Sequence, residues 1–428
     1  MIPKNPKAED VLKALGEPTA HGGNPPFWDE AMAALQEGTP AFLAPETLAA
    51  RREQNGLPAA RDPLLREMAA TVAADPPLLA LAWYLHWRVF VIPGRGVSWG
   101  APPLTGRLGS RAGMFYELLA LEFAPRLAAR HREWGYPASV TAQTVKQVAA
   151  YESNHLRGRG EPGIYENQFP WFATYLAMPH VRLGRLEFQL CSYEGGVSVW
   201  RRAADGQVLA LAEDGARVMD DGLLAGAADT GFWTATRRED EQTVEGFPVD
   251  PAGRILRQRV VLRRPEWTPV FSKGTTVLNL HIPAGGGMTW ESVCDSFRQA
   301  QPFFTRHHPD RPFAALVVGT WFMDPRLADI LPASANPLRM QRACYLFPIP
   351  PAPGGLWFVF LRDTVACDSA TLPRDTSLRR ALADFLASGK RWHGGGMFVL
   401  PEDLASPREG CYTGRFAALR AAGLPGGD

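Results

Sequence analysis

The strongest constraint on the fold is a change in sequence character near residue 160. Before this point, segments rich in Ala, Leu, Glu and Arg repeat apolar residues at helical spacing. After it, short runs of β-branched and aromatic residues alternate with turn residues, which is typical of strands. The stretch between them, HLRGRGEPGIYENQFPW (155–171), is rich in glycine and proline. We therefore predict an α+β protein with a helical domain over 1–160 and a mixed α/β domain over 161–428.

The charge balance narrows the choice of partners. The chain has 428 residues, of which 46% are hydrophobic and 21% charged, as expected for a folded protein with ample core. Lys and Arg (45) nearly cancel Asp and Glu (44), so no overall field attracts nucleic acid or an anionic membrane surface. We therefore expect neither nucleic acid nor a membrane as a partner. The oligomeric state is left open by the sequence.

The cysteine pattern indicates whether the chain could hold a metal site or disulfides, and the N-terminal segment indicates its cellular location. The five cysteines contain no CxxC pattern, and neither HExxH nor GxSxG occurs, so we predict no metal, no disulfide framework and no serine hydrolase site. The N-terminal segment lacks the apolar core of a secretory signal. The most apolar run, 78–93, carries His86 and Arg88 and is shorter than the ~20 residues that span a bilayer. These features predict a cytoplasmic protein.

Three segments carry the helical prediction for the first half. Residues 76–90 are apolar almost all round, which predicts the central helix of a bundle. Residues 110–135 predict a helix capped by Ser110 and kinked at Pro125. Residues 140–155 predict a further helix.

The second half predicts strands first and then an alternation of strands and helices. The segments 182–193 and 196–212 predict a meander, with Asp205-Gly206 as a hairpin turn, and further antiparallel strands follow up to Ile282. The alternation then predicts a mixed sheet. Its expected elements are helices at 290–304, 325–331 and 376–387, and strands at 314–319, 342–349, 356–361 and 397–400.

The stretch LNLHIPAGGGMTWESV (278–293) predicts a strand, a glycine turn and a helix. Thr289 suits an N-cap, and Glu291 lies in the first turn, where the helix dipole favours a negative charge. Glycines before a helix N-terminus free backbone N–H groups to converge on an anion, most commonly phosphate. A triple glycine is equally compatible with a flexible turn.

Five longer motifs identify a resemblance. They are IYENQFPWF (164–172), RLGRLEFQL (182–190), VLNLHIPAGGGMTWESVCDSFRQAQPFF (277–304), GTWFMDPRLADILPASANPLRMQR (319–342) and LPRDTSLRRALADFLASGKRWHGGGMFVLP (372–401). With them, the chain resembles a bacterial acyltransferase family in which a helical N-acyltransferase N-terminal domain precedes a GNAT-like C-terminal domain. The resemblance implies a GNAT-like mixed sheet, here enlarged by antiparallel strands between residues 196 and 264.

The resemblance also implies a co-substrate. In GNAT acyltransferases the glycine turn holds the pyrophosphate of an acyl-coenzyme A, so the backbone contact would fall to Gly285, Gly286, Gly287 and Met288. The family usually carries Gln or Arg three residues before the first glycine of this turn, whereas this chain has Ile282.

Acyl transfer from a thioester to an amine requires a base that takes the amine proton. His281 ends the strand before the glycine turn, and an unperturbed histidine pKa of about 6.5 suits this task; the alternative is that His281 orders the loop. Glu187 is the second candidate, on a strand that is otherwise apolar. By alternation Arg185, Glu187 and Gln189 share one face, which either lines a cleft or faces solvent.

Three further residues are candidates for substrate binding. Tyr165 and Glu166 follow the glycine-rich stretch, where a seam between domains is expected; the alternative is a capping or interdomain hydrogen bond. Trp321 follows a predicted strand and either lines an acyl channel or fills the core.

The predicted function is direct transfer of an acyl group from acyl-coenzyme A to a small-molecule or peptide amine. The main alternative is a catalytically inactive GNAT-like module that binds a ligand or a protein, which Ile282 favours. A third possibility is that the helical domain binds a peptide or a partner along the apolar segment 76–90.

Overall fold

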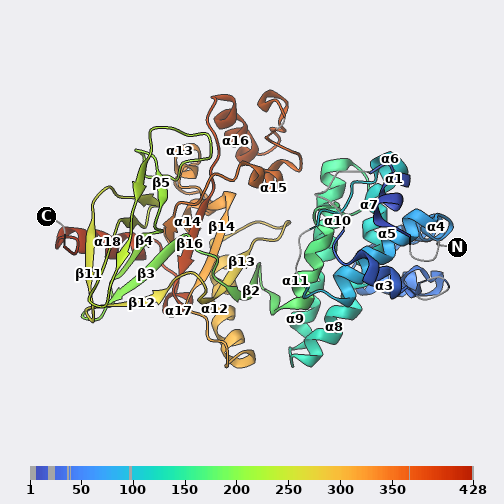
Figure 1. Cartoon of the computed structure of the whole chain (residues 1–428), viewed down its shortest axis with the longest axis horizontal. Coiled ribbons are helices and arrows are strands. Elements are labelled where there is room, and N and C mark those ends of the chain that lie inside the picture. Colours follow the sequence, from blue (N-terminus) through green and yellow to red (C-terminus); the bar gives the residue numbers. More distant parts are fainter. Residues whose placement is uncertain are drawn as a thin grey trace. The chain divides into compact units, whose positions relative to one another are not determined.

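The computed structural model of the chain describes residues 6–17, 25–35, 38, 40–95, 99–365 and 367–426. It divides into two compact units (Figure 1). The helical unit comprises Met1–Leu183 together with Ile282–Gly286, and the sheet unit comprises Gly184–His281 together with Gly287–Asp428.

The helical unit consists of helices around one apolar core. Its helices are α1 (Ala8–Ala14), α2 (Trp28–Ala33), α3 (Pro45–Gln54), α4 (Asp62–Ala74), α5 (Pro76–His86), α6 (Thr105–Leu108), α7 (Ala112–Ala120), α8 (Phe123–Glu133), α9 (Ala138–Val145), α10 (Gln147–Arg159) and α11 (Phe172–Ala177), and the strand β1 (His180–Leu183) ends the unit. The prediction of a helical first half is confirmed.

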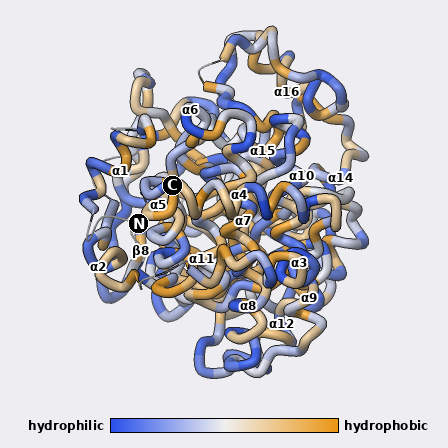
Figure 2. The backbone as a smooth tube through the Cα atoms, turned by 90° about the vertical axis from the view of Figure 1, so that its right-hand side faces the viewer, coloured by the Kyte–Doolittle hydropathy of each residue, from blue (hydrophilic) through white to orange (hydrophobic). Residues whose placement is uncertain are grey.

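Helix α5 is the central helix that its composition predicts. Asp75 caps it by accepting a hydrogen bond of 3.3 Å from the Leu78 N–H, and Pro76 occupies its first turn, where no backbone donor is needed. Its buried residues fall on all sides, and one π-helical turn, Trp87–Val91, continues it. Figure 2 shows the apolar residues of this unit concentrated in its inner helices.

Two details predicted for 110–135 are wrong. The segment forms two helices, because the chain breaks between α7 and α8. Pro125 therefore lies in the first turn of α8, where its missing N–H leaves no hydrogen bond broken. Buried Asn55 stabilises the break by donating to the Leu121 carbonyl (2.8 Å) and accepting from the Ala124 N–H (3.2 Å). Ser110 lies in a 3-10 turn and does not cap α7.

The structure divides the chain later than the boundary predicted after residue 160. The segment that follows this boundary contributes buried aromatic side chains to the helical core. Phe169, Phe172 and Tyr175 are all fully buried there, and α11 packs against α8. Their burial ties the segment up to Leu183 to the helical unit.

No single helix among the described residues is long and apolar enough to cross a membrane. The segments Ala59–Ala74 and Pro76–Val91 reach that length only together, across a bend of 110°. Both contribute side chains to the core of the helical unit.

The main sheet of the second unit has the strand order β2-β13-β14-β16-β15. Its strands are β2 (Leu186–Ser192), β13 (Thr276–His281), β14 (Leu316–Thr320), β15 (Tyr345–Phe347) and β16 (Gly395–Val399). Strands β13 and β14 run parallel, and the other neighbours run antiparallel. The predicted mixed sheet is therefore confirmed.

The additional antiparallel strands predicted between residues 196 and 264 are present, but they form separate sheets and do not enlarge the main sheet as predicted. A second sheet has the order β10-β9-β4-β3-β12, and two smaller sheets accompany it. Their strands are β3 (Val197–Arg202), β4 (Val208–Ala212), β5 (Ala216–Val218), β6 (Trp233–Ala235), β7 (Arg238–Glu239), β8 (Thr243–Gly246), β9 (Pro248–Asp250), β10 (Arg254–Ile255), β11 (Val260–Arg263) and β12 (Trp267–Phe271). The main sheet and the second sheet share one hydrophobic core, in which the Tyr345 hydroxyl accepts from the Ala210 N–H (3.2 Å).

The sheet unit contains the three helices predicted at 290–304, 325–331 and 376–387, and further helices that were not predicted. Its helices are α12 (Trp290–His307), α13 (Leu327–Ile330), α14 (Asn336–Arg342), α15 (Trp357–Phe360), α16 (Ser377–Ala387), α17 (Pro401–Leu404) and α18 (Cys411–Ala421). Thr289 caps α12 as predicted, accepting from the Ser292 N–H at 3.3 Å.

Two predictions for this unit need correction. The segments 182–193 and 196–212 do not form one meander, because β2 pairs with β13 whereas β3 pairs with β4 and β12; the Asp205-Gly206 hairpin within the second segment is confirmed. The strand expected at 356–361 is helix α15, which buries Val359 and Phe360 in a separate hydrophobic cluster. Helices α14, α17 and α18 were not predicted.

Candidate active site

The pairing of β2 with β13 brings the two predicted catalytic residues together. The antiparallel register places His281 directly opposite Glu187 and Asn279 opposite Gln189. Directly opposed residues have Cβ atoms about 4.5–5.5 Å apart and lie on the same face of the sheet. The intervening Leu186, Phe188 and Leu190 are fully buried on the other face. The result is a polar patch of Glu187, Gln189, Asn279 and His281, called the polar face below.

A short contact orients the imidazole within the polar face. His281 Nε2 lies 2.9 Å from Gln189 Oε1 and 3.3 Å from Asn279 Nδ2. The shorter contact fits Nε2–H donating to the Gln189 carbonyl oxygen, and in that case the approach of the Asn279 amide nitrogen, itself a donor, is not a hydrogen bond. In that tautomer Nδ1 carries the lone pair, which is the form a general base requires.

Glu187 is 1% exposed and Gln189 is 8% exposed, so the polar face does not face bulk solvent at β2. This favours the cleft alternative for Glu187 over the solvent alternative. A buried carboxylate lowers the free energy of unfolding unless neighbouring groups compensate its charge. Buried carboxylates therefore often mark functional sites.

The polar face lies where two parallel strands stop pairing. Strands β13 and β14 pair at Leu278 with Leu316 and at Asn279 with Val317. Strand β13 continues to His281, while β14 continues to Thr320 in pairing with β16 alone. Ligands of open α/β sheets bind outside the carboxyl ends of such strands, where backbone groups are available to them.

The glycine turn follows His281 directly. Gly285 (φ 84°) and Gly286 (φ 65°) adopt left-handed backbone conformations, and Gly285, Gly286 and Gly287 are exposed. A side chain added at Gly287 would meet open space. Met288 is half-buried. The turn leads into the 18-residue helix α12, so its backbone can bind an anion, and the four predicted coenzyme contacts stay predictions.

Alternation predicted Arg185 on one strand face with Glu187 and Gln189, but Arg185 lies in the turn before β2 and approaches the glycine turn instead. Its Nε donates to the carbonyl oxygen of Gly287 at 3.4 Å. The signal that could have found it is the LGRL turn, whose glycine allows a close approach to the next helix.

Tyr165 and Glu166 lie in the helical unit. Tyr165 is 2% exposed, its ring centroid is 4.8 Å from that of His155, and burial raises the pKa of its hydroxyl. Its carbonyl accepts from the N–H groups of Gln168 (3.0 Å) and Phe169 (3.2 Å), which supports a structural contribution. Glu166 is half-buried. Binding of substrate by either residue stays a prediction.

Trp321 follows β14 directly, in a 3-10 turn over Trp321–Met323. Its side chain packs against a hydrophobic cluster that includes Leu327 and Trp392, and its carbonyl accepts from Trp392 Nε1 at 3.0 Å. These contacts favour the core alternative for this residue. Its place in an acyl channel is untested.

The cysteines and the other potential metal ligands show whether a nucleophilic thiol or a metal ion could take part in the reaction. Burial raises the pKa of the thiols of Cys191, Cys294, Cys344 and Cys411, which makes them poor nucleophiles at neutral pH. Within the described part of the chain, no three His, Cys, Asp or Glu residues form a group that could hold a metal ion.

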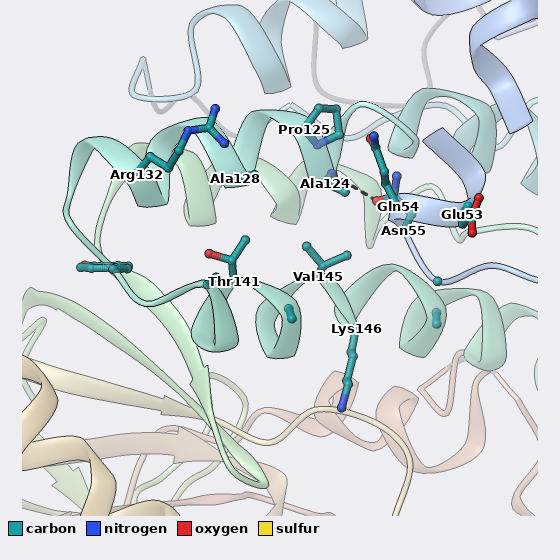
Figure 3. A pocket seen from close by; sticks show the side chains of 15 residues that line it. Glu53, Gln54, Asn55, Ala124, Pro125, Ala128, Arg132, Thr141, Val145 and Lys146 are labelled. Atoms are coloured by element: carbon teal, nitrogen blue, oxygen red, sulfur yellow. Dashed lines mark hydrogen bonds between the residues drawn. The ribbon is translucent and has the colours of Figure 1, made fainter. Parts of the chain in front are cut away.

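A concavity of about 900 Å³ lies in the helical unit, away from the polar face in sequence (Figure 3). Small side chains of α8 and α9, including Ala124, Ala128 and Ala142, line it. Asn55, one of its polar residues, is engaged with the break between α7 and α8. None of the predicted site residues lines this concavity.

Comparison with known proteins gives two family matches. The model of the GNAT-like C-terminal domain matches residues 180–398, and the model of the N-acyltransferase N-terminal domain matches residues 46–178. A search of curated proteins finds no match.

Solved structures share the fold over nearly the whole chain. A crystal structure of an acyltransferase in complex with CoA and 10C-teicoplanin is similar with a TM-score of 0.59 and 22% identity, over 92% of this chain and 99% of that chain. An acyltransferase in complex with decanoyl-CoA gives a TM-score of 0.57 with the same identity and coverage. The GNAT-like domain alone matches more than half of the chain. The chain therefore belongs to the acyltransferase family that joins an N-acyltransferase N-terminal domain to a GNAT-like C-terminal domain.

Proposed function

We propose that this protein transfers an acyl group from acyl-coenzyme A directly to the amine of a small-molecule acceptor. The observation that carries the proposal is the polar face, in which His281 and Glu187 oppose one another at the strand end that leads into the glycine turn. The acyltransferases of similar fold were solved with CoA, decanoyl-CoA or teicoplanin compounds, which supports acyl-coenzyme A as the donor and a small molecule as the acceptor.

In the proposed reaction, the acceptor nitrogen attacks the thioester carbonyl carbon while His281 takes a proton from the amine. The C–N bond forms, the C–S bond breaks, and the coenzyme leaves as a thiolate that a proton then neutralises. Glu187, opposite His281, stabilises the imidazolium electrostatically. The raised pKa values of the buried thiols support direct transfer over a covalent acyl-cysteine.

The glycine turn is proposed to bind the pyrophosphate through the backbone N–H groups of Gly285, Gly286, Gly287 and Met288. Tyr165, Glu166 and Trp321 remain proposed substrate contacts. We also propose a cytoplasmic location, where acyl-coenzyme A is available.

The test is a turnover assay of the full chain with acyl-coenzyme A donors of graded length and a panel of amines, in which released thiol is measured. Gly287→Asp should abolish coenzyme binding, because it places a carboxylate at the turn without backbone strain. Gly287→Ala is the matched control, since the added methyl meets open space. Binding of acyl-coenzyme A without turnover of any amine would favour the inactive binding module, to which Ile282 points.

A further inference from the structure

We propose that Arg185 binds the coenzyme pyrophosphate and so replaces the polar side chain, Gln or Arg, that the family usually carries at the position of Ile282. The inference rests on the proposed function and names a binding residue outside the glycine turn. Arg185 lies on the turn between β1 and β2, far from the glycine turn in sequence.

The backbone of Arg185 is anchored on helix α12. Its N–H donates to Ser296 Oγ at 2.8 Å. Ser296 is fully buried and donates in turn to the Ser292 carbonyl at 2.9 Å, in the first turns of α12. The position of Arg185 is therefore tied to the helix whose N-terminus faces the glycine turn.

Gly184 makes this close approach possible. Its φ of +65° lies in the left-handed region, and a Cβ at this position would lie 2.8 Å from Ser296 Oγ and 3.2 Å from Asp295 Oδ2. A side chain at residue 184 would strain the left-handed backbone and would displace Ser296 Oγ, the acceptor of the Arg185 N–H. The glycine thus places the adjacent arginine at the beginning of the helix.

The side chain of Arg185 reaches the glycine turn. Its Nε donates to the Gly287 carbonyl at 3.4 Å, which brings the guanidinium beside the last glycine of the turn. A guanidinium presents five donors in a planar fork that can bind two phosphate oxygens. Two negatively charged side chains, Glu291 and Asp295, also lie in the first turns of α12. Asp295 accepts a hydrogen bond of 2.7 Å from Gln299.

Ile282 cannot supply this charge. It is a half-buried apolar residue three positions before Gly285. Backbone N–H groups alone would have to compensate both charges of a pyrophosphate, whereas a neighbouring arginine compensates one of them directly.

The test compares two donors that differ only in the part Arg185 would bind. Acyl-coenzyme A carries the pyrophosphate, and the same acyl group on pantetheine does not. With Arg185→Gln, we expect the Kd of acyl-coenzyme A to rise by about 10-fold or more, as for loss of a charge-assisted phosphate contact, with kcat nearly unchanged. Turnover of acyl-pantetheine should be the same as in the unmodified protein.

Two further variants separate charge from folding. Arg298→Gln removes the same charge from the exposed surface of α12 and should leave both donors unaffected. Ile282→Arg in the Arg185→Gln background restores a cation at the position usual for the family and should recover most of the lost affinity. Arg185→Lys keeps the positive charge but loses the planar fork of donors, so it should bind acyl-coenzyme A with intermediate affinity. This variant provides the test if Arg185→Gln does not fold.

The possible outcomes are distinct. Unchanged acyl-coenzyme A affinity in Arg185→Gln, or in Arg185→Lys if only that variant folds, overturns the inference and leaves the proposed function standing. An equal loss with acyl-coenzyme A and acyl-pantetheine also overturns it, because the residue then acts on the fold or the chemistry. If the unmodified protein neither binds nor uses acyl-coenzyme A, the proposed function fails together with the inference.

Discussion

In the helical unit the buried Glu122 lies within the packed core, whereas in the sheet unit the buried Glu187 lies opposite the end of a strand. Glu122 of the helical unit pairs with Arg51 (2.5 Å) and contacts His86 Nε2 (3.3 Å). Glu187 of the sheet unit opposes His281, beside strand ends that stop pairing with each other. Burial of a charged group is therefore not enough to identify a functional site. The group must also lie where the backbone is open to a ligand.

The largest expected effect is on turnover at the polar face. His281→Ala should lower kcat by about 100-fold to 10,000-fold, as for loss of a general base, with little change in acyl-coenzyme A affinity. His307→Ala, at the end of α12, is the matched control. Unchanged turnover in His281→Ala would leave His281 as a residue that orders the loop.

The second effect is a loss of stability at Asp324, a buried charged residue of the sheet unit with a structural role. Asp324 is fully buried, pairs with Arg326 at 2.6 Å and accepts from the N–H groups of His393 and Gly394 at 3.0 Å each. Asp324→Ala should reduce the free energy of unfolding by about 3–5 kcal/mol, because it leaves the arginine without its partner. Urea denaturation measures this. Asp329→Ala, at an exposed position of α13, should change stability by less than about 0.5 kcal/mol.

The third effect concerns the helical unit and its dependence on pH. Glu117 is fully buried, and neither carboxylate oxygen has a hydrogen-bond partner among the described residues. Burial, together with Glu152, raises its pKa to about 8, against the opposing effect of Arg61. Folding therefore retains a proton that the unfolded chain releases near pH 4.5. Stability should fall as pH rises from 4.5 to about 8, by at most about 5 kcal/mol.

Glu117→Gln tests this pH dependence, because the amide stays neutral. The variant should show a flatter stability profile between pH 5 and 8 in urea denaturation followed by circular dichroism. Glu133→Gln, at the exposed end of α8, is the control and should retain the slope of the unmodified protein. A profile of Glu117→Gln that keeps the full slope would place the proton elsewhere.

The smallest effect sharpens the description of the polar face. Gln189→Leu removes the acceptor 2.9 Å from His281 Nε2 and should lower kcat by about 10-fold, because the imidazole then populates both tautomers. Gln189→Glu keeps an acceptor and adds a negative charge, so its pH profile should move to higher pH as the imidazolium is stabilised. Equal losses in the two variants, without any change in pH profile, would show that Gln189 acts only through packing.

Local signals in the sequence determined the two-part organisation, the helical first half, the Asp205-Gly206 hairpin, the cap at Thr289 and the strand, glycine turn and helix around His281. These features depend on residues close together in the chain, whose periodicity and backbone preferences act over one or two turns. The candidate base and the glycine turn could be named for the same reason.

Tertiary structure alone decided which of these features meet. The break between α7 and α8 depends on Asn55. The pairing of Glu187 with His281 depends on the register between two strands about 90 residues apart in sequence. A slip of about one residue in this register would turn these side chains to the other face of the sheet. The place of Arg185 beside Gly287 depends on the packing of one turn against α12. Such contacts arise between residues distant in sequence, so no local pattern encodes them.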